Sequence, residues 1–117
     1  MTEPLPPILD HAYLRGLYSR ESSPHFLSHL FHLFLQHMPE ILLQVHSCIH
    51  QGKDQDLIKH VHRLKGSASC VGATHMSTLC ERFESGSLAL SDFIPQLESS
   101  SLQTYEAVHA MLCKEKT

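Results

Sequence analysis

The segment from Leu57 to Val71 reads LIKHVHRLKGSASCV. Its apolar residues recur at alternating intervals of four and three, the spacing of one face of an α-helix: Leu57, Val61, Leu64, Ala68 and Val71. This pattern is typical of a helix that packs along the seam of a helical bundle. The segment therefore predicts a helix over about 55–71, with Asp54 as its N-terminal cap and Gly72 as the residue that ends it.

Helical periodicity also extends upstream of this segment. A short helix is expected over about 8–19, after an irregular proline-containing lead at 1–7. A long apolar pattern predicts a second helix over about 24–51, begun by a serine cap with Pro24 in the first helical position. Pro39 lies inside that pattern, and it should bend the helix or split it into two. The phenylalanines of this stretch are expected in the core: Phe26, Phe31 and Phe34.

Two more helices are expected downstream, over about 75–85 and 91–113. Thr74 should cap the first of them, and Pro95 should fall in the first turn of the second, where proline is tolerated. The residues expected to face the core are Met76, Leu79, Cys80 and Phe83, followed by Phe93, Ile94, Leu97, Leu102, Tyr105, Val108 and Leu112.

No segment shows the sustained alternation of a strand, and the connections between the expected helices are short. Short connections place consecutive helices antiparallel. We therefore expect an all-α fold, an up-and-down antiparallel four-helix bundle with a short extra N-terminal helix. With 117 residues, 42% of them hydrophobic, the chain is long enough for a single domain over 1–117 with its own core.

Composition excludes several classes of protein. The formal net charge of −3 argues against a general nucleic-acid binder. No apolar run approaches the roughly 20 residues that span a bilayer, and the N-terminus does not resemble a signal peptide. The four cysteines form no CxxC pair, so we expect reduced, mostly buried thiols in a cytoplasmic protein: Cys48, Cys70, Cys80 and Cys113.

The chemistry concentrates on the solvent side of the 55–71 helix. His62, Lys65 and Gly66 are neighbours on one face, because residues three and four apart lie together on a helix. A neutral imidazole is a nucleophile, and Lys65 could stabilise the charge of a phosphoryl group. Gly66 costs roughly 0.5–1 kcal/mol of helix stability relative to alanine, and its missing side chain would let a partner approach closely.

Other residues of this helix are candidates for contacts with such a partner. Lys59 and Arg63 add positive potential near His62, and Ile58, one turn before His62, offers an apolar contact. Ser67 and Ser69 are candidates for hydrogen bonds near the phosphoryl group.

The run His62-Arg63-Leu64-Lys65-Gly66-Ser67-Ala68, followed by Val71-Gly72-Ala73, resembles the HxLKGS…GA signature of histidine-containing phosphotransfer (HPt) domains. The proline-containing stretch from His37 to Leu42 and the run from Cys80 to Glu84 are also similar to segments of that family. The resemblance implies that His62 is the phosphoacceptor and that it exchanges a phosphoryl group with the aspartate of receiver domains. The receiver would supply Mg²⁺, so no metal or other cofactor is expected on this chain, and the bundle alone is expected to be a monomer.

The resemblance also implies a partner for the histidine. Many relatives carry Gln or Glu about 22 residues beyond it, and here that position is Glu84. We expect Glu84 to accept a hydrogen bond from Nδ1–H of His62, which would fix the tautomer and leave Nε2 as the nucleophile.

Two other functions are left open. A non-catalytic module of the same fold could bind and inhibit a receiver or a kinase without being phosphorylated. A histidine-rich bundle could bind a metal through residues at helical spacing, namely His25, His29 and His32, or His46 and His50. No glycine-rich phosphate loop is present, so we expect a phosphocarrier without its own ATP site. Whether the chain is free-standing or part of a hybrid kinase, and which receivers it serves, are not readable from the sequence.

Overall fold

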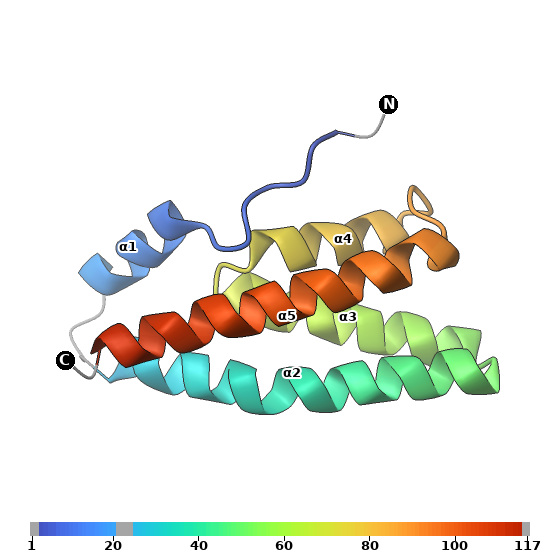
Figure 1. Ribbon diagram of the computed structural model, residues 1–117, viewed down its shortest axis with the longest axis horizontal. Helices are drawn as coiled ribbons and strands as arrows, with labels where there is room; N and C mark the ends of the chain where they lie inside the picture. Colours follow the sequence, from blue (N-terminus) through green and yellow to red (C-terminus); the bar gives the residue numbers. More distant parts are fainter. Residues whose placement is uncertain (1–2, 21–24, 116–117) are drawn as a thin grey trace.

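The computed structural model describes residues 3–20 and 25–115, and all regular secondary structure in those two ranges is helical. The helices are α1 (His11–Arg20), α2 (Phe26–Gln51), α3 (Asp54–Cys70), α4 (Thr74–Glu84) and α5 (Leu90–Glu115). Helices α2 to α5 run alternately up and down the long axis, while α1 lies outside them (Figure 1). The predicted all-α bundle with an extra N-terminal helix is confirmed.

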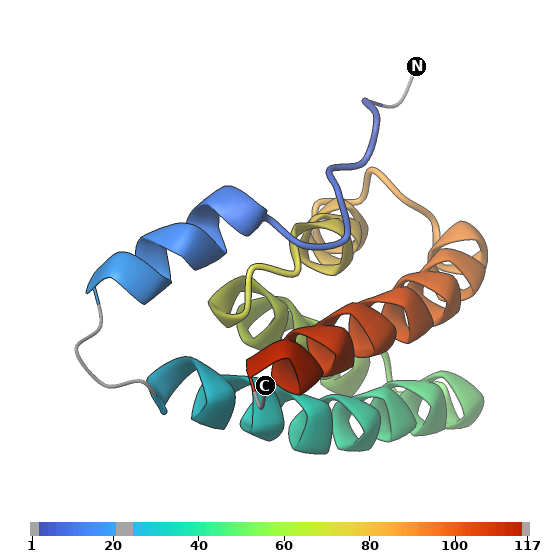
Figure 2. The ribbon, with the colours of Figure 1, turned by 60° about the vertical axis from the view of Figure 1, so that its left-hand side comes forward.

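The core lies between helices α2, α3, α4 and α5, which Figure 2 shows obliquely, toward one end of the bundle. Helix α2 packs on α3, α3 on α4, α4 on α5, and α5 on α2. Every apolar residue predicted to face the core from α3 is buried, at 3% exposure or less. The spacing of apolar residues by four and three thus determines which face of α3 is buried, and it leaves His62 on the opposite face.

The N-terminal part is attached at the turn between α3 and α4. Gly72 has φ of +73°, and a Cβ at this position would lie 3.0 Å from Cδ1 of Tyr13. The amide of Asp10 donates to the Gly72 carbonyl at 2.8 Å, and the Tyr13 hydroxyl donates to the Cys70 carbonyl at 3.2 Å. Leu9 and Leu14 are buried on either side of this attachment. Glycine is therefore required here for both its backbone conformation and its lack of a side chain.

Helix α1 begins later than predicted, at His11 and not near residue 8. The carboxylate of Asp10 accepts a hydrogen bond from the Tyr13 amide at 3.1 Å, which caps the helix. Leu9 therefore belongs to the lead, where it is buried without being helical. The serine cap and Pro24 predicted to begin the second helix lie outside the described residues.

Two predicted caps were wrong. Asp54 is the first residue of α3, preceded by Lys53, so its carboxylate lies in the first turn, where it favours the helix dipole. Thr74 is the first residue of α4, and its hydroxyl donates to the Pro7 carbonyl at 2.9 Å. The Thr74 side chain therefore holds the lead in place instead of capping the helix.

The two internal prolines are accommodated without ending a helix. Helix α2 is continuous through the exposed Pro39, so the alternative of a split helix is excluded. Helix α5 begins at Leu90, so Pro95 lies in the second turn and not in the first as predicted. The carbonyl that loses its donor belongs to the exposed Ser91, which can bond to water instead.

The buried face of α5 differs from the prediction. Leu102 is 61% exposed and Tyr105 is 39% exposed, whereas Ser100, Ser101 and Thr104 are buried. The geometry of the helix selects these small polar residues because they continue the face that begins with Phe93 and Leu97. The Ser101 hydroxyl is satisfied within the helix, where it donates to the Leu97 carbonyl.

Phe26 was also predicted wrongly as a core residue. It is 40% exposed at the first position of α2, whereas Phe31 and Phe34 are buried further along the helix. No helix in the described ranges is long and apolar enough to span a lipid bilayer.

Candidate functional site

His62 projects from the middle of α3, with most of its side chain in solvent. Its ring is held from one side by α4, because Nδ1 lies 3.1 Å from Oε2 of Glu84. The Glu84 side chain is only 18% exposed, and that of His62 is 68% exposed. A neutral imidazole protonated at Nδ1 donates to this carboxylate, and its Nε2 is then the unprotonated nitrogen. The contact predicted between His62 and Glu84 is present.

Lys65 is turned toward the same helix. Its ammonium Nζ lies 2.8 Å from Oε2 of Glu81 and 3.2 Å from the buried Oε1 of Glu84. Hydrogen bonds to Glu81 and then to Glu84 raise the pKa of Lys65 above its ordinary value, and Lys65 in turn lowers the pKa of Glu81. Two carboxylates of α4 therefore hold two polar side chains of α3.

Glu81 is the member of this set that we did not predict as a site residue. Helices α3 and α4 run in opposite directions, so the residue three positions after His62 lies opposite the residue three positions before Glu84. Lys65 and Glu81 are those two residues. The pairing of His62 with Glu84, together with the antiparallel arrangement, was therefore a signal that could have found Glu81.

Gly66 leaves one patch of α3 without a side chain, one turn beyond His62. A Cβ built at this position has no heavy atom within 4 Å, leaving aside its neighbours in the helix. Packing within the chain therefore does not require glycine here, although glycine in a helix costs about 0.5–1 kcal/mol. The bare backbone beside an exposed imidazole is instead suited to close approach by another molecule.

One comparison with known proteins decides the family. The model of the Hpt domain matches residues 29–112, which is well over half of the chain. This chain belongs to the Hpt domain family. It is a histidine phosphotransfer module of two-component signalling; Hpt domains are phosphocarriers that interact with receiver domains and do not use ATP themselves. No curated protein and no solved structure matches the chain.

The residues predicted to contact a partner of this Hpt domain are distributed unevenly around His62. Ile58 is 51% exposed, and Lys59 and Arg63 are also exposed. Ser69 is exposed on the His62 side, but its hydroxyl donates to the Lys65 carbonyl at 2.9 Å. Ser67 faces α2 instead, where it lines a hollow with four α2 residues, namely Leu30, Leu33, Phe34 and His37. The structure therefore does not bring Ser67 to the imidazole.

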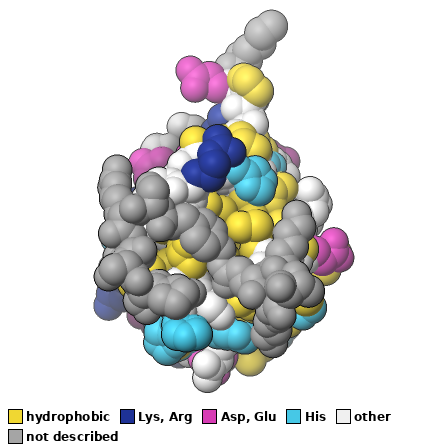
Figure 3. Space-filling view, turned by 90° about the vertical axis from the view of Figure 1, so that its left-hand side faces the viewer, with side chains coloured by type: hydrophobic (Ala, Val, Ile, Leu, Met, Phe, Trp, Pro, Cys, Tyr) yellow, Lys and Arg dark blue, Asp and Glu magenta, His cyan; other side chains and the backbone are white. Residues whose placement is uncertain are grey.

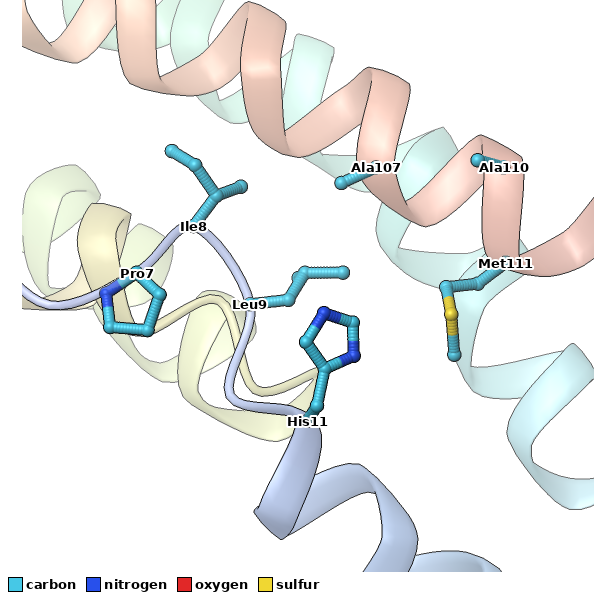
Figure 4. Close-up of a pocket in the computed structure, with 7 residues that line it drawn as sticks. All are labelled: Pro7, Ile8, Leu9, His11, Ala107, Ala110 and Met111. Atoms are coloured by element: carbon cyan, nitrogen blue, oxygen red, sulfur yellow. The ribbon is translucent and has the colours of Figure 1, made fainter.

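An apolar hollow of about 330 Å³ lies away from this site, between the N-terminal lead and α5 (Figure 4). Its walls include Ile8 and Leu9 on one side and Ala107 and Met111 on the other. Hydrophobic side chains also reach the surface at the end of the molecule shown in Figure 3. His62 does not line this hollow, so the Hpt domain presents its histidine on an open helical face.

The Hpt domain gives no geometric support to a histidine-rich metal centre. Across residues 3–20 and 25–115, no three His, Cys, Asp or Glu side chains are grouped so that they could hold a metal ion. All four cysteines are free thiols. The expectation of mostly buried thiols is wrong, because Cys48 and Cys80 are buried but Cys70 and Cys113 are exposed.

Proposed function

We propose that Nε2 of His62 accepts a phosphoryl group from the aspartyl phosphate of a receiver domain and passes it to the aspartate of another. The observation that carries this proposal is the contact of Nδ1 with Glu84 at 3.1 Å, on a ring that is otherwise mostly in solvent. A base held at Nδ1 gives the ring one orientation and one reactive nitrogen.

The proposed transfer needs no nucleophile, acid or base beyond the groups of the two proteins. The lone pair of Nε2 forms a bond to phosphorus as the bond from phosphorus to the aspartate oxygen breaks, and the electron pair of that bond stays on the carboxylate. The proton on Nδ1 remains there, so the ring becomes positively charged. Glu84 stabilises that charge because its carboxylate already bonds to the same N–H. The return transfer is the reverse of these events.

The surroundings of His62 support a protein as the source of the phosphoryl group. Gly66 leaves the backbone uncovered, and Ile58 offers an apolar contact one turn away. We propose that Mg²⁺ comes with the receiver, that this chain contributes no cofactor, and that the domain acts as a monomer in the cytoplasm.

The test loads Mg²⁺-bound receivers with labelled phosphate and adds the wild-type chain, His62→Gln or His60→Gln. His60 lies on the same helix two residues away and is the matched control. We expect acid-labile, base-stable label on the wild type and on His60→Gln, and none on His62→Gln.

Label that remains on His62→Gln would refute His62 as the acceptor. If all three proteins bind a receiver but none becomes labelled, the chain is instead a non-catalytic module that occupies the receiver.

A further inference from the structure

Lys65 lies one turn beyond the proposed phosphoryl site on α3, but two carboxylates of α4 already bind it. Glu81 accepts a hydrogen bond from Nζ at 2.8 Å, and Oε1 of Glu84 lies at 3.2 Å. The ammonium of Lys65 has three N–H donors and two carboxylates beside it, so a phosphoryl group on His62 competes with them for its charge and its hydrogen bonds. The two carboxylates differ in how easily each can lose its contact with Lys65.

The two carboxylates differ in their exposure to solvent and in their other partners. Glu84 is 18% exposed and is also bonded to the His62 ring, so it is held at both oxygens. Glu81 is 61% exposed, and within the described ranges Lys65 is the one side chain that bonds to its carboxylate. A polar hollow of about 380 Å³ adjoins the Lys65–Glu81 pair, lined also by Ser69, Ser77 and Thr78. Glu81 can therefore move away without displacing packed atoms.

We propose that Glu81 is a positioning residue that binds Lys65 in the unphosphorylated protein and competes for it with the phosphoryl group on His62. This proposal rests on the function proposed for His62. On phosphorylation, Lys65 exchanges Glu81 for phosphoryl oxygens, while Glu84 stays on the ring. Glu81 therefore sets how the phosphoryl group is distributed at equilibrium between His62 and the receiver aspartate.

The size of the effect follows from the exposure of the pair. A solvent-exposed ion pair of this kind shifts an equilibrium by about two- to fivefold. Glu81→Gln should therefore raise the ratio of phosphohistidine to phosphoaspartate by about that factor, because Lys65 is no longer held. Glu81→Asp keeps the charge and should return the ratio toward the wild-type value. Glu98 has the same side-chain exposure on α5, so Glu98→Gln is the matched control for loss of one surface charge.

The experiment measures this ratio at equilibrium in wild type, Glu81→Gln, Glu81→Asp and Glu98→Gln, each also in a Lys65→Met background. The proposal expects the increase in Glu81→Gln alone, and no increase when Lys65 is already methionine. An unchanged ratio in Glu81→Gln would overturn it. An equal increase in both backgrounds would also overturn it, because the effect would then be direct repulsion between Glu81 and the phosphoryl group.

A second measurement separates this proposal from the function of His62. The pKa of Lys65, followed by NMR of its side chain, should fall in unphosphorylated Glu81→Gln and not in Glu98→Gln. Phosphoramidate, a small donor that needs no receiver, then supplies phosphate to His62. If His62 takes up no phosphate from either donor, the proposed function fails whatever the pKa of Lys65. If His62 is phosphorylated and the pKa of Lys65 does not respond to Glu81→Gln, only the role of Glu81 fails.

Discussion

Glu84 contacts both groups that the proposed chemistry uses. One oxygen bonds to the ring of His62, and the other pairs with Lys65. Because Glu84 itself does not touch the reacting phosphorus in the proposed transfer, its effect is on the orientation and charge of the imidazole. A substitution at Glu84 should therefore change the tautomer of His62 as well as the rate of transfer.

We expect Glu84→Ala to slow transfer to His62 by about 10- to 100-fold, since a hydrogen bond to a charged group contributes about 1.5–3 kcal/mol. Glu84→Gln can still accept from Nδ1–H and should lose less. The ¹⁵N shifts of the His62 ring should show the Nδ1–H tautomer in wild type and a mixture in Glu84→Ala. Glu106→Ala, at an exposed position of α5, is the control. An unchanged tautomer in Glu84→Ala would contradict this role.

Gly66 should show a conflict between stability and function. Because a side chain at this position meets open space, Gly66→Ala should stabilise the fold by about 0.5–1 kcal/mol, measured by urea unfolding. Transfer from a receiver should become slower in Gly66→Ala and slower again in Gly66→Met, as the side chain obstructs the approach. Transfer at the wild-type rate in Gly66→Met would show that the bare backbone has no role in docking.

At the scale of the elements, α4 and α5 are joined by a polar contact inside an otherwise apolar interface. Nδ1 of the half-buried His75 lies 2.8 Å from the hydroxyl of the buried Ser100. About two turns further along the same pair of helices, the rings of Phe83 and Phe93 stack with centroids 4.5 Å apart. Burial, followed by the positive charge of Arg82, lowers the pKa of His75 below its ordinary value. The folded state thus favours neutral His75.

This contact predicts a dependence of stability on pH. In the unfolded chain His75 binds a proton near pH 6.5, whereas in the folded protein its pKa is lower. The contribution of neutral His75 to the free energy of unfolding is therefore fully present above pH 6.5. It is lost as the pH falls through the folded pKa. The free energy of unfolding should decline less between pH 7.5 and 5 in His75→Gln than in wild type. His32→Gln, at an exposed position, should decline as the wild type does. Parallel curves for His75→Gln and wild type would contradict the prediction.

The helices were predictable from periodicity, but their ends and part of their buried faces were not. The apolar spacing in α3 is regular, and all its predicted core residues are buried. In α5 the prediction followed residue type, which favoured Leu102 and Tyr105, whereas the geometry of the helix buries Ser100 and Thr104. Thr74 was mistaken for a cap because its partner, the Pro7 carbonyl, is 67 residues away in sequence. Contacts of this range leave no local pattern to read.

At the scale of the whole molecule, the bundle buries two of its four cysteines and leaves the other two exposed. Burial raises the pKa of Cys80 to about 12, and Cys48 is 7% exposed, whereas Cys70 and Cys113 are exposed. We expect a maleimide to label Cys70 and Cys113 in the folded protein, and all four cysteines after unfolding in urea. Peptide mass spectrometry identifies the sites. Rapid labelling of Cys80 in the folded protein would contradict the packing of α4.

The candidate site was predictable in part because it depends on two helices that are close in sequence. His62, Lys65 and Gly66 are neighbours on a single helix, so spacing alone relates them. The position of Glu84 came from resemblance to a family, and its contact with His62 depends on how α4 is placed against α3. Glu81 was missed because its contact with Lys65 follows only when the predicted pair of His62 and Glu84 is combined with the antiparallel arrangement of α3 and α4.

The connection of three residues between α3 and α4, from Val71 to Ala73, has a consequence for changes in chain length. The length of this connection determines how far α4 is shifted along α3. It therefore also determines whether Glu84 reaches His62 and Glu81 reaches Lys65. An insertion in this connection changes how α4 is placed along α3, so we expect both pairs to be weakened or lost even if the four helices still form. The connection between α4 and α5, over 85–89, lies after both carboxylates and carries no such constraint. Insertions such as peptide tags or sensor modules should therefore be placed at 85–89, and a tag between α3 and α4 should abolish transfer in a folded protein.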